Sequence, residues 1–281
     1  MLSSLSMWLG SFCFRLSHSS TNIQCPNLNR SRRHRWLMVK KIAYIILILI
    51  FIQIMNQFLI FTGSVIERAI HLDFGYPTKI VGVYQQIVQA ATGIVLFRWI
   101  FKKDIHDLGI NLRHKNLSLR FFYIFALIWI SIIGGYVCLT YFFFPSAWAA
   151  MKSVELPQTN TIIVTLLFQG FFPGFGEEIL FRGFIINLLS ALVFTHFRHS
   201  KANQLGIILV SSAYFAIAHI YFTLTPFRII HIDYLQIATA VGCGTLYAFF
   251  YLKTNNLLAP FLAHNFSNTT ATICGYLISA L

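Results

Sequence analysis

Charged residues are scarce in this sequence, and acidic residues are the scarcest of them. Only 10% of the 281 residues are charged, 57% are hydrophobic, and Asp and Glu together number 8. A soluble domain carries roughly 25% charged residues, so a water-soluble globule is excluded and lipid must solvate much of the surface. The net charge of +13 would suggest nucleic acid in a soluble protein. Here the basic residues lie mostly between apolar runs, so we expect contacts with anionic lipids and no nucleic-acid partner.

Several catalytic and structural motifs are absent as well. The five cysteines form no Cys-x-x-Cys pair, so neither a disulfide framework nor a zinc–cysteine site is expected. The His-Glu-x-x-His motif of zinc peptidases and the Gly-x-Ser-x-Gly motif of serine hydrolases are both missing. The sequence shows no internal repeat, which gives inverted-repeat transporters no direct support.

Long apolar stretches dominate what remains. A helix that crosses the hydrocarbon layer needs about 20 apolar residues, and we expect an all-α, multi-pass transmembrane helix bundle of about seven spans. The fourth stretch is too long for one straight span and contains Pro173, Gly174 and Gly176, which predicts a kink or a re-entrant break. The seven stretches cover residues 42–62, 80–101, 120–144, 161–195, 205–222, 234–252 and 257–280.

The basic residues predict an orientation. With the N-terminus in the cytoplasm and one crossing for each stretch, the inside segments hold 16 Lys and Arg residues and the outside loops hold 4. Cytoplasmic loops are enriched in Lys and Arg, so a cytoplasmic N-terminus is predicted.

The N-terminal segment differs from the rest in composition. Residues 1–41 contain no Asp or Glu, are rich in Ser and end in a basic run. We expect residues 1–41 to be a basic, disordered segment that precedes a transmembrane domain at 42–281. A true translation start at Met38 is the alternative interpretation.

Three charged side chains lie inside the fourth apolar stretch. Each of Glu177, Glu178 and Arg182 costs at least about 2.5–3.5 kcal/mol near the centre of a bilayer. Glu178 and Arg182 are four residues apart, so they share a helix face and can pair. Glu177 then points about 100° away without a local partner, and can exchange a proton with a substrate or water. The plainer interpretation is a structural ion-pair network that holds helices together.

Two later stretches add polar groups at membrane depth, namely His219, His264 and Asn268. Each alone is explained by an interhelical hydrogen bond. Together with Glu177 they suit hydrolysis: the carboxylate deprotonates water, one imidazole orients it, and the other imidazole with the amide stabilises the oxyanion. A zinc site formed by Glu177, His219 and His264 is the alternative.

The three motifs have the spacing of a known family. Glu-Glu-x-x-x-Arg at 177–182, Phe-x-x-x-His at 215–219 and His-x-x-x-Asn at 264–268 resemble those of the CPBP family. These are the CAAX proteases and bacteriocin-processing enzymes, also called the Abi family. The resemblance covers roughly residues 160–275 and marks the motif-bearing core of the domain.

The resemblance implies an intramembrane, CAAX-prenyl-protease-like endopeptidase of the bacterial plasma membrane. Its substrate would be a membrane-embedded or lipidated protein or peptide. By the family pattern Glu177 would activate water, His219 would position it, and His264 and Asn268 would form the oxyanion hole. Glu178 and Arg182 would shape the site or hold substrate. The family is now viewed as glutamic peptidases, so no cofactor is favoured and Zn²⁺ is the alternative.

Two other functions stay open at this point. The first is a non-hydrolytic membrane immunity or scaffold protein of the same fold, since bacterial members are linked to bacteriocin self-immunity. The second is a proton-coupled transporter, because intramembrane Glu and His residues are also normal there.

Overall fold

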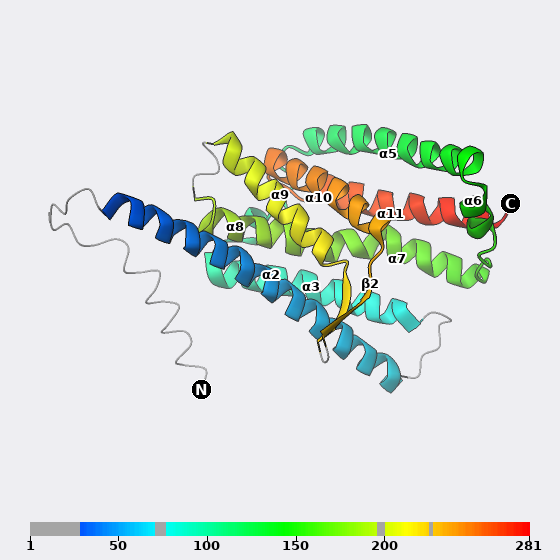
Figure 1. Cartoon of the computed structure of the whole chain (residues 1–281), viewed down its shortest axis with the longest axis horizontal. Helices are drawn as coiled ribbons and strands as arrows, with labels where there is room; N and C mark the ends of the chain where they lie inside the picture. The colour runs from blue at the N-terminus through cyan, green and yellow to red at the C-terminus, as the bar shows by residue number, and fades with distance from the viewer. Residues whose placement is uncertain (1–28, 71–76, 196–199, 225–226) are drawn as a thin grey trace. The chain divides into compact units, whose positions relative to one another are not determined.

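The computed structural model describes residues 29–70, 77–195, 200–224 and 227–281, and these form an all-α fold with one short hairpin (Figure 1). This confirms the predicted fold class. The helices are α2 (Asn29–Ile70), α3 (Pro77–Phe101), α4 (Ile105–Leu108), α5 (Lys115–Phe143), α6 (Pro145–Lys152), α7 (Thr159–Glu178), the π-helix η1 (Ile179–Ile185), α8 (Ile186–Leu192), α9 (Lys201–Ile217), α10 (Tyr234–Thr254) and α11 (Leu258–Ser279). The strands are β1 (Tyr221–Leu224) and β2 (Phe227–His231), which pair antiparallel.

The chain divides into two compact units, Met1–Ile42 and Ala43–Leu281. In the first unit, residues 1–28 lie outside the described residues, and with them lies most of the predicted N-terminal segment. We expected disorder up to residue 41, but residues 29–41 form the start of α2. A long run of apolar residues follows them, and helix extends readily from an existing helix because each added residue gains a hydrogen bond. The domain boundary after residue 41 and the start at Met38 stay predictions.

The second unit is a helical bundle built around α7. Helix α7 packs against α3 and against α11, while α10 packs against α9 and α11 (Figure 1). Helix α5 covers α11 and contacts α10. The motif-bearing helices α7 and α11 therefore pack against each other, and α9, which carries the remaining motif, packs against α10 and η1.

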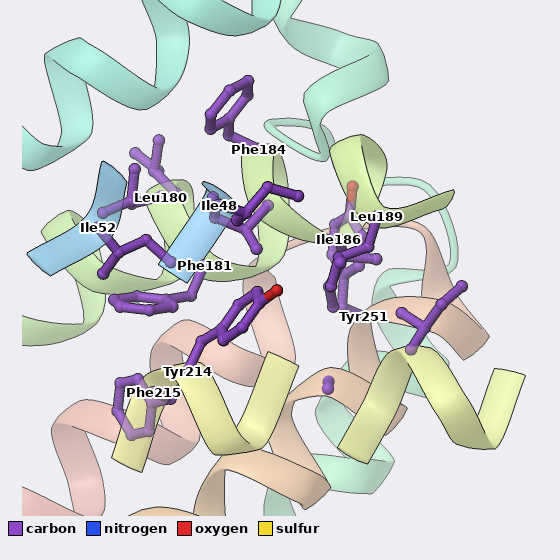
Figure 2. Close-up of a cluster of buried hydrophobic side chains, with 14 of the residues drawn as sticks. Ile48, Ile52, Leu180, Phe181, Phe184, Ile186, Leu189, Tyr214, Phe215 and Tyr251 are labelled. Carbon is purple, nitrogen blue, oxygen red and sulfur yellow. The ribbon is translucent and has the colours of Figure 1, made fainter. Parts of the chain in front are cut away.

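The buried core lies around η1. Leu180, Phe181 and Phe184 of η1 pack with Tyr214 and Phe215 of α9 (Figure 2). The outer surface is apolar too: Leu127, Phe142 and Phe143 of α5 are between 69% and 74% exposed. Apolar side chains that face outward in such density are stable in lipid and not in water.

Among the residues that the structure describes, four helical segments are long and apolar enough to cross a membrane, so the chain is an integral membrane protein. They are Arg35–Arg68, Lys115–Phe143, Thr159–Leu192 and Tyr234–Thr254. The count of about seven spans stays a prediction.

The fourth apolar stretch is helical without interruption from Thr159 to Leu192. No re-entrant break occurs within these described residues; Pro173 lies inside α7, and a π-helical turn follows at η1. Near the proline, the Gly174 N–H donates to Asn265 Oδ1 at 2.8 Å, and Asn265 Nδ2 donates to the Phe171 carbonyl at 3.5 Å. A side chain from α11 thus binds two backbone groups of α7 beside the proline, where polar groups in an apolar medium need partners within the protein.

The fifth apolar stretch ends earlier than predicted. We expected helix over 205–222, but α9 ends at Ile217 and the chain turns through His219 into β1. The residues of β1 and β2 are largely aromatic and β-branched, and such side chains favour a strand. His219 therefore lies just past the end of a helix.

Candidate active site

The buried carboxylate Glu178 is the centre of the polar site. Its Oε1 accepts hydrogen bonds from Arg182 NH1 at 3.0 Å and from His264 Nδ1 at 2.7 Å. The side chains of Glu178 and Arg182 are 1% and 0% exposed, so the predicted pairing of these two residues is confirmed. A buried charge without a partner costs several kcal/mol, and the pairing lowers that cost for both residues.

Arg182 has further contacts that fix its position. Its NH2 group donates to the Gly244 carbonyl of α10 at 3.3 Å. The guanidinium carbon lies 4.4 Å from the ring centre of Phe215 and 5.3 Å from that of Tyr247, which are favourable cation–π distances. Residues of α9 and α10 therefore fix the position of the Arg182 guanidinium, which in turn pairs with Glu178.

His264 is oriented by its neighbours. Its Nδ1–H donates to the Glu178 carboxylate, which leaves Nε2 as the free ring nitrogen. The imidazole stacks on Tyr247 with ring centres 5.4 Å apart and meets the edge of Phe215 at 5.7 Å. In this orientation Nε2 lies 3.9 Å from Glu177 Oε2. That distance is too long for a direct hydrogen bond, but one oxygen atom can lie about 2.8 Å from both atoms.

Glu177 has one free and one bound oxygen. Its Oε1 accepts a hydrogen bond of 2.9 Å from Gln86 Nε2 of α3. Its Oε2 has no hydrogen-bond partner within the described part of the chain. Glu177 is 16% exposed, against 1% for Glu178. The free oxygen faces His264, so the two adjacent glutamates have different surroundings and can have different tasks.

Gln86 was missed in the sequence analysis, although a signal existed. Three glutamines interrupt the apolar stretch at 80–101, at positions 85, 86 and 89, and polar groups inside a membrane helix need partners. Gln86 reaches Glu177 because Gly176 lets α3 approach α7. A Cβ atom at Gly176 would lie 2.6 Å from the Gln86 carbonyl oxygen and 2.7 Å from its Cα, distances that no side chain tolerates. Small residues at helix crossings commonly allow the backbones of two membrane helices to approach this closely.

His219 and Asn268 lie beside this cluster. His219 Nδ1 bonds the Phe215 carbonyl at 2.7 Å, and its ring lies 4.8 Å from that of Phe215, which also contacts His264. Asn268 is one turn after His264 on α11 and partly buried. In the described part of the chain neither side chain is hydrogen-bonded to Glu177. Their roles therefore stay predictions.

An apolar cavity of about 560 Å³ reaches the polar cluster at Glu178. Its wall comes from the segment after α4, from the end of α7 and from the start of α11. A cavity of this size, with apolar walls and few polar groups, is typical of a ligand pocket. The side chains that line it include His106, Asn111, Leu112, Phe175, Ile179, Leu257, Leu258 and Phe261.

Metal ligation was the alternative for Glu177, His219 and His264. Across the ranges that the structure describes, no three His, Cys, Asp or Glu side chains gather in a way that could hold a metal ion. The placement of these three residues therefore gives a zinc site no support, and the expectation of no cofactor stays a prediction.

Comparison with known proteins agrees with the motifs. Residues 159–270 match the family model described as Type II CAAX prenyl endopeptidase Rce1-like. No curated protein and no solved structure matches the chain. The match runs from the start of α7 into α11 and includes all six predicted site residues, whereas Gln86 lies outside it. The match bears out the resemblance that the motifs indicate: residues 159–270, the motif-bearing part of this chain, are similar to the Rce1-like endopeptidases of the CPBP family.

Proposed function

We propose that this chain is an intramembrane endopeptidase of the glutamic type. It hydrolyses a peptide bond in a membrane-embedded or lipidated protein or peptide, and Glu177 is the general base. The observation that carries the proposal is the separation of 3.9 Å between Glu177 Oε2 and His264 Nε2. A free carboxylate oxygen and a free imidazole nitrogen face each other there, and Glu178, which binds His264, lines a cavity that opens to the protein surface.

Glu177 starts the reaction in this proposal. Its unpartnered Oε2 takes a proton from a water molecule as the water oxygen attacks the scissile carbonyl carbon. The protonated carboxyl then gives that proton to the leaving nitrogen, and the C–N bond breaks. The products are a carboxylate and an amine, and Glu177 returns to its ionised form.

His264 and Asn268 stabilise the tetrahedral intermediate. The Glu178 carboxylate holds the imidazole through Nδ1 at 2.7 Å, and His264 donates its Nε2–H to the developing oxyanion. The Asn268 amide, one turn further along α11, supplies a second donor. Donors held in place before charge develops contribute much of enzymatic rate enhancement. The Arg182–Glu178 pair supplies that rigidity.

His219 helps to hold the attacking water. Because its Nδ1 is bonded to the Phe215 carbonyl at 2.7 Å, this nitrogen carries the proton and Nε2 is an acceptor. In the proposal, one hydrogen of the attacking water is donated to Glu177 and the other to His219 Nε2.

The proposed orientation puts the site near the cytoplasmic face. His264 is six residues from Leu258, where α11 begins, a rise of about 9 Å. With the N-terminus inside, this end of α11 and the exposed Lys102, Lys103 and Lys115 face the cytoplasm of a bacterial cell. Basic side chains there bind anionic lipid headgroups.

The test compares membrane-associated peptides from cells that make the wild-type chain with those from cells that make Glu177→Gln. The wild type should yield a cleavage product that the variant lacks, because an amide cannot take the proton from water. Glu155→Gln is the matched control, since Glu155 is exposed and lies between α6 and α7. Identical peptide profiles for wild type and Glu177→Gln, at equal expression, would contradict the endopeptidase proposal and favour a non-hydrolytic role in immunity or as a scaffold.

A further inference from the structure

Helix α3 lies outside the family match, yet it contacts the reacting carboxylate. We propose that Gln86 is the positioning residue of Glu177: it binds one carboxylate oxygen so that the other faces His264. This inference rests on the proposed role of Glu177 as general base, and it adds a part of the machinery that the motifs do not contain.

The contact has the geometry that such a role needs. Gln86 Nε2 lies 2.9 Å from Glu177 Oε1, and the Gln86 side chain is buried at 5% exposure. A carboxylate only accepts hydrogen bonds, so the amide must present its NH₂ group to it. The free Oε2 is then the oxygen at 3.9 Å from His264 Nε2.

Nothing else in the described residues holds the Glu177 side chain by a hydrogen bond. Glutamate has three side-chain torsions, and their free rotation would spread Oε2 over several positions. A displacement of about 1 Å can cost on the order of 100-fold in rate. The hydrogen bond from Gln86 to Glu177 Oε1 therefore accounts for the orientation of Oε2 toward His264.

The backbone around Gln86 is also held in place. Gly176 and Gln86 are in such close contact that a Cβ atom at Gly176 would overlap the Gln86 backbone. The donor of α3 and the carboxylate of α7 thus sit on two helices that cannot slide apart without loss of packing. At this crossing the glutamine side chain spans the gap between α3 and the Glu177 carboxylate.

The same helix offers a matched control. Gln89 is three residues further along α3, is 2% exposed, and donates to Asn56 Oδ1 of α2 at 3.1 Å. Gln89 is the same residue type as Gln86, lies on the same helix and is also buried, but its partner is Asn56, which lies outside the proposed catalytic groups. Gln86→Met and Gln89→Met each remove one buried amide hydrogen bond and keep the side-chain length.

The experiment measures kcat, KM and the melting temperature of purified variants in detergent. The substrate is a peptide that spans the cleavage site found in the comparison of membrane peptides. We expect Gln86→Met to lower kcat by about 10–100-fold with KM within about twofold, because a positioned base acts in the transition state. Gln89→Met should keep the wild-type kcat, and both variants should lower the melting temperature to a similar extent.

Gln86→Glu adds a readout that a structural role would not change. The introduced carboxyl donates a hydrogen bond to Glu177 only while it is protonated, and repels it when ionised. Its activity relative to wild type should therefore be highest at low pH and fall as the pH rises. A buried residue that merely fills space would give a ratio that does not depend on pH.

Each outcome decides the matter. Wild-type kcat in Gln86→Met, an equal loss in Gln89→Met, or unfolding of both Gln86 variants would overturn the positioning role. If Glu177→Gln is inactive while Gln86→Met is fully active, this inference fails and the proposed function survives. If Glu177→Gln keeps full activity, the general-base proposal itself fails.

Discussion

Replacement of Arg182 by Met should show what the buried ion pair contributes. The variant loses the 3.0 Å bond to Glu178, the bond to the Gly244 carbonyl and the contacts with the Phe215 and Tyr247 rings. Methionine fills much of the arginine volume, so the cavity term is small. What remains is the cost of a carboxylate left without its cation, about 3–5 kcal/mol when one partner of a buried pair is removed.

A double-mutant cycle separates this charge effect from packing. Glu178→Gln alone leaves the guanidinium uncompensated, whereas Glu178→Gln with Arg182→Met leaves no buried charge from the pair. The double variant should be more stable than the sum of the single losses by about 1–3 kcal/mol. The measurement is SDS-induced unfolding in mixed micelles. Arg120→Met, at an exposed position of α5, is the control and should stay within about 0.5 kcal/mol of wild type. Strict additivity, or a loss below about 1 kcal/mol for Arg182→Met, would refute the reasoning.

Three further predictions concern local geometry. Gly176→Ala should cost about 1–3 kcal/mol by overpacking against α3 and reduce cleavage. Gly134→Ala, where a Cβ meets nothing within 4 Å, should not destabilise; equal melting temperatures for the two variants would count against the close helix crossing. Asn265→Leu should cost about 1–3 kcal/mol in SDS unfolding, because the Gly174 N–H loses its acceptor; an unchanged midpoint would show that this N–H finds another partner. Asp233→Ala removes the α10 N-cap and should cost about 1 kcal/mol while peptide cleavage stays at the wild-type rate, and a lost activity would mean that this cap supports the site.

Part of the site was predictable because it depends on local spacing. Glu178 and Arg182 are one helical turn apart, so their pairing follows from the helix repeat alone, and the structure confirms it. The same reasoning left Glu177 on a different face, without a local partner. The three motifs predicted the family for the same reason, since each motif is a short pattern on one segment.

The rest of the site depends on contacts between distant segments. Gln86 and Glu177 are 91 residues apart, and Asn265 binds a backbone group at Gly174. Neither contact follows from spacing, because it requires the crossing of two helices in one register. His219 was placed inside a helix by hydropathy, which does not distinguish an apolar helix from an apolar turn and hairpin.

The sequence alone determined the solvent, the fold class and the family. Scarce charge and long apolar stretches are properties of composition, and they are stable only in lipid. The three motifs are short local patterns, and the helix repeat alone decides which of their residues share a face. Only the tertiary structure decided which oxygen of Glu177 is bound and which faces His264. That choice depends on a hydrogen bond from α3 and on the buried chain from Arg182 through Glu178 to His264. Such bonds join groups from different helices, and their free energies are gained only when the helices pack.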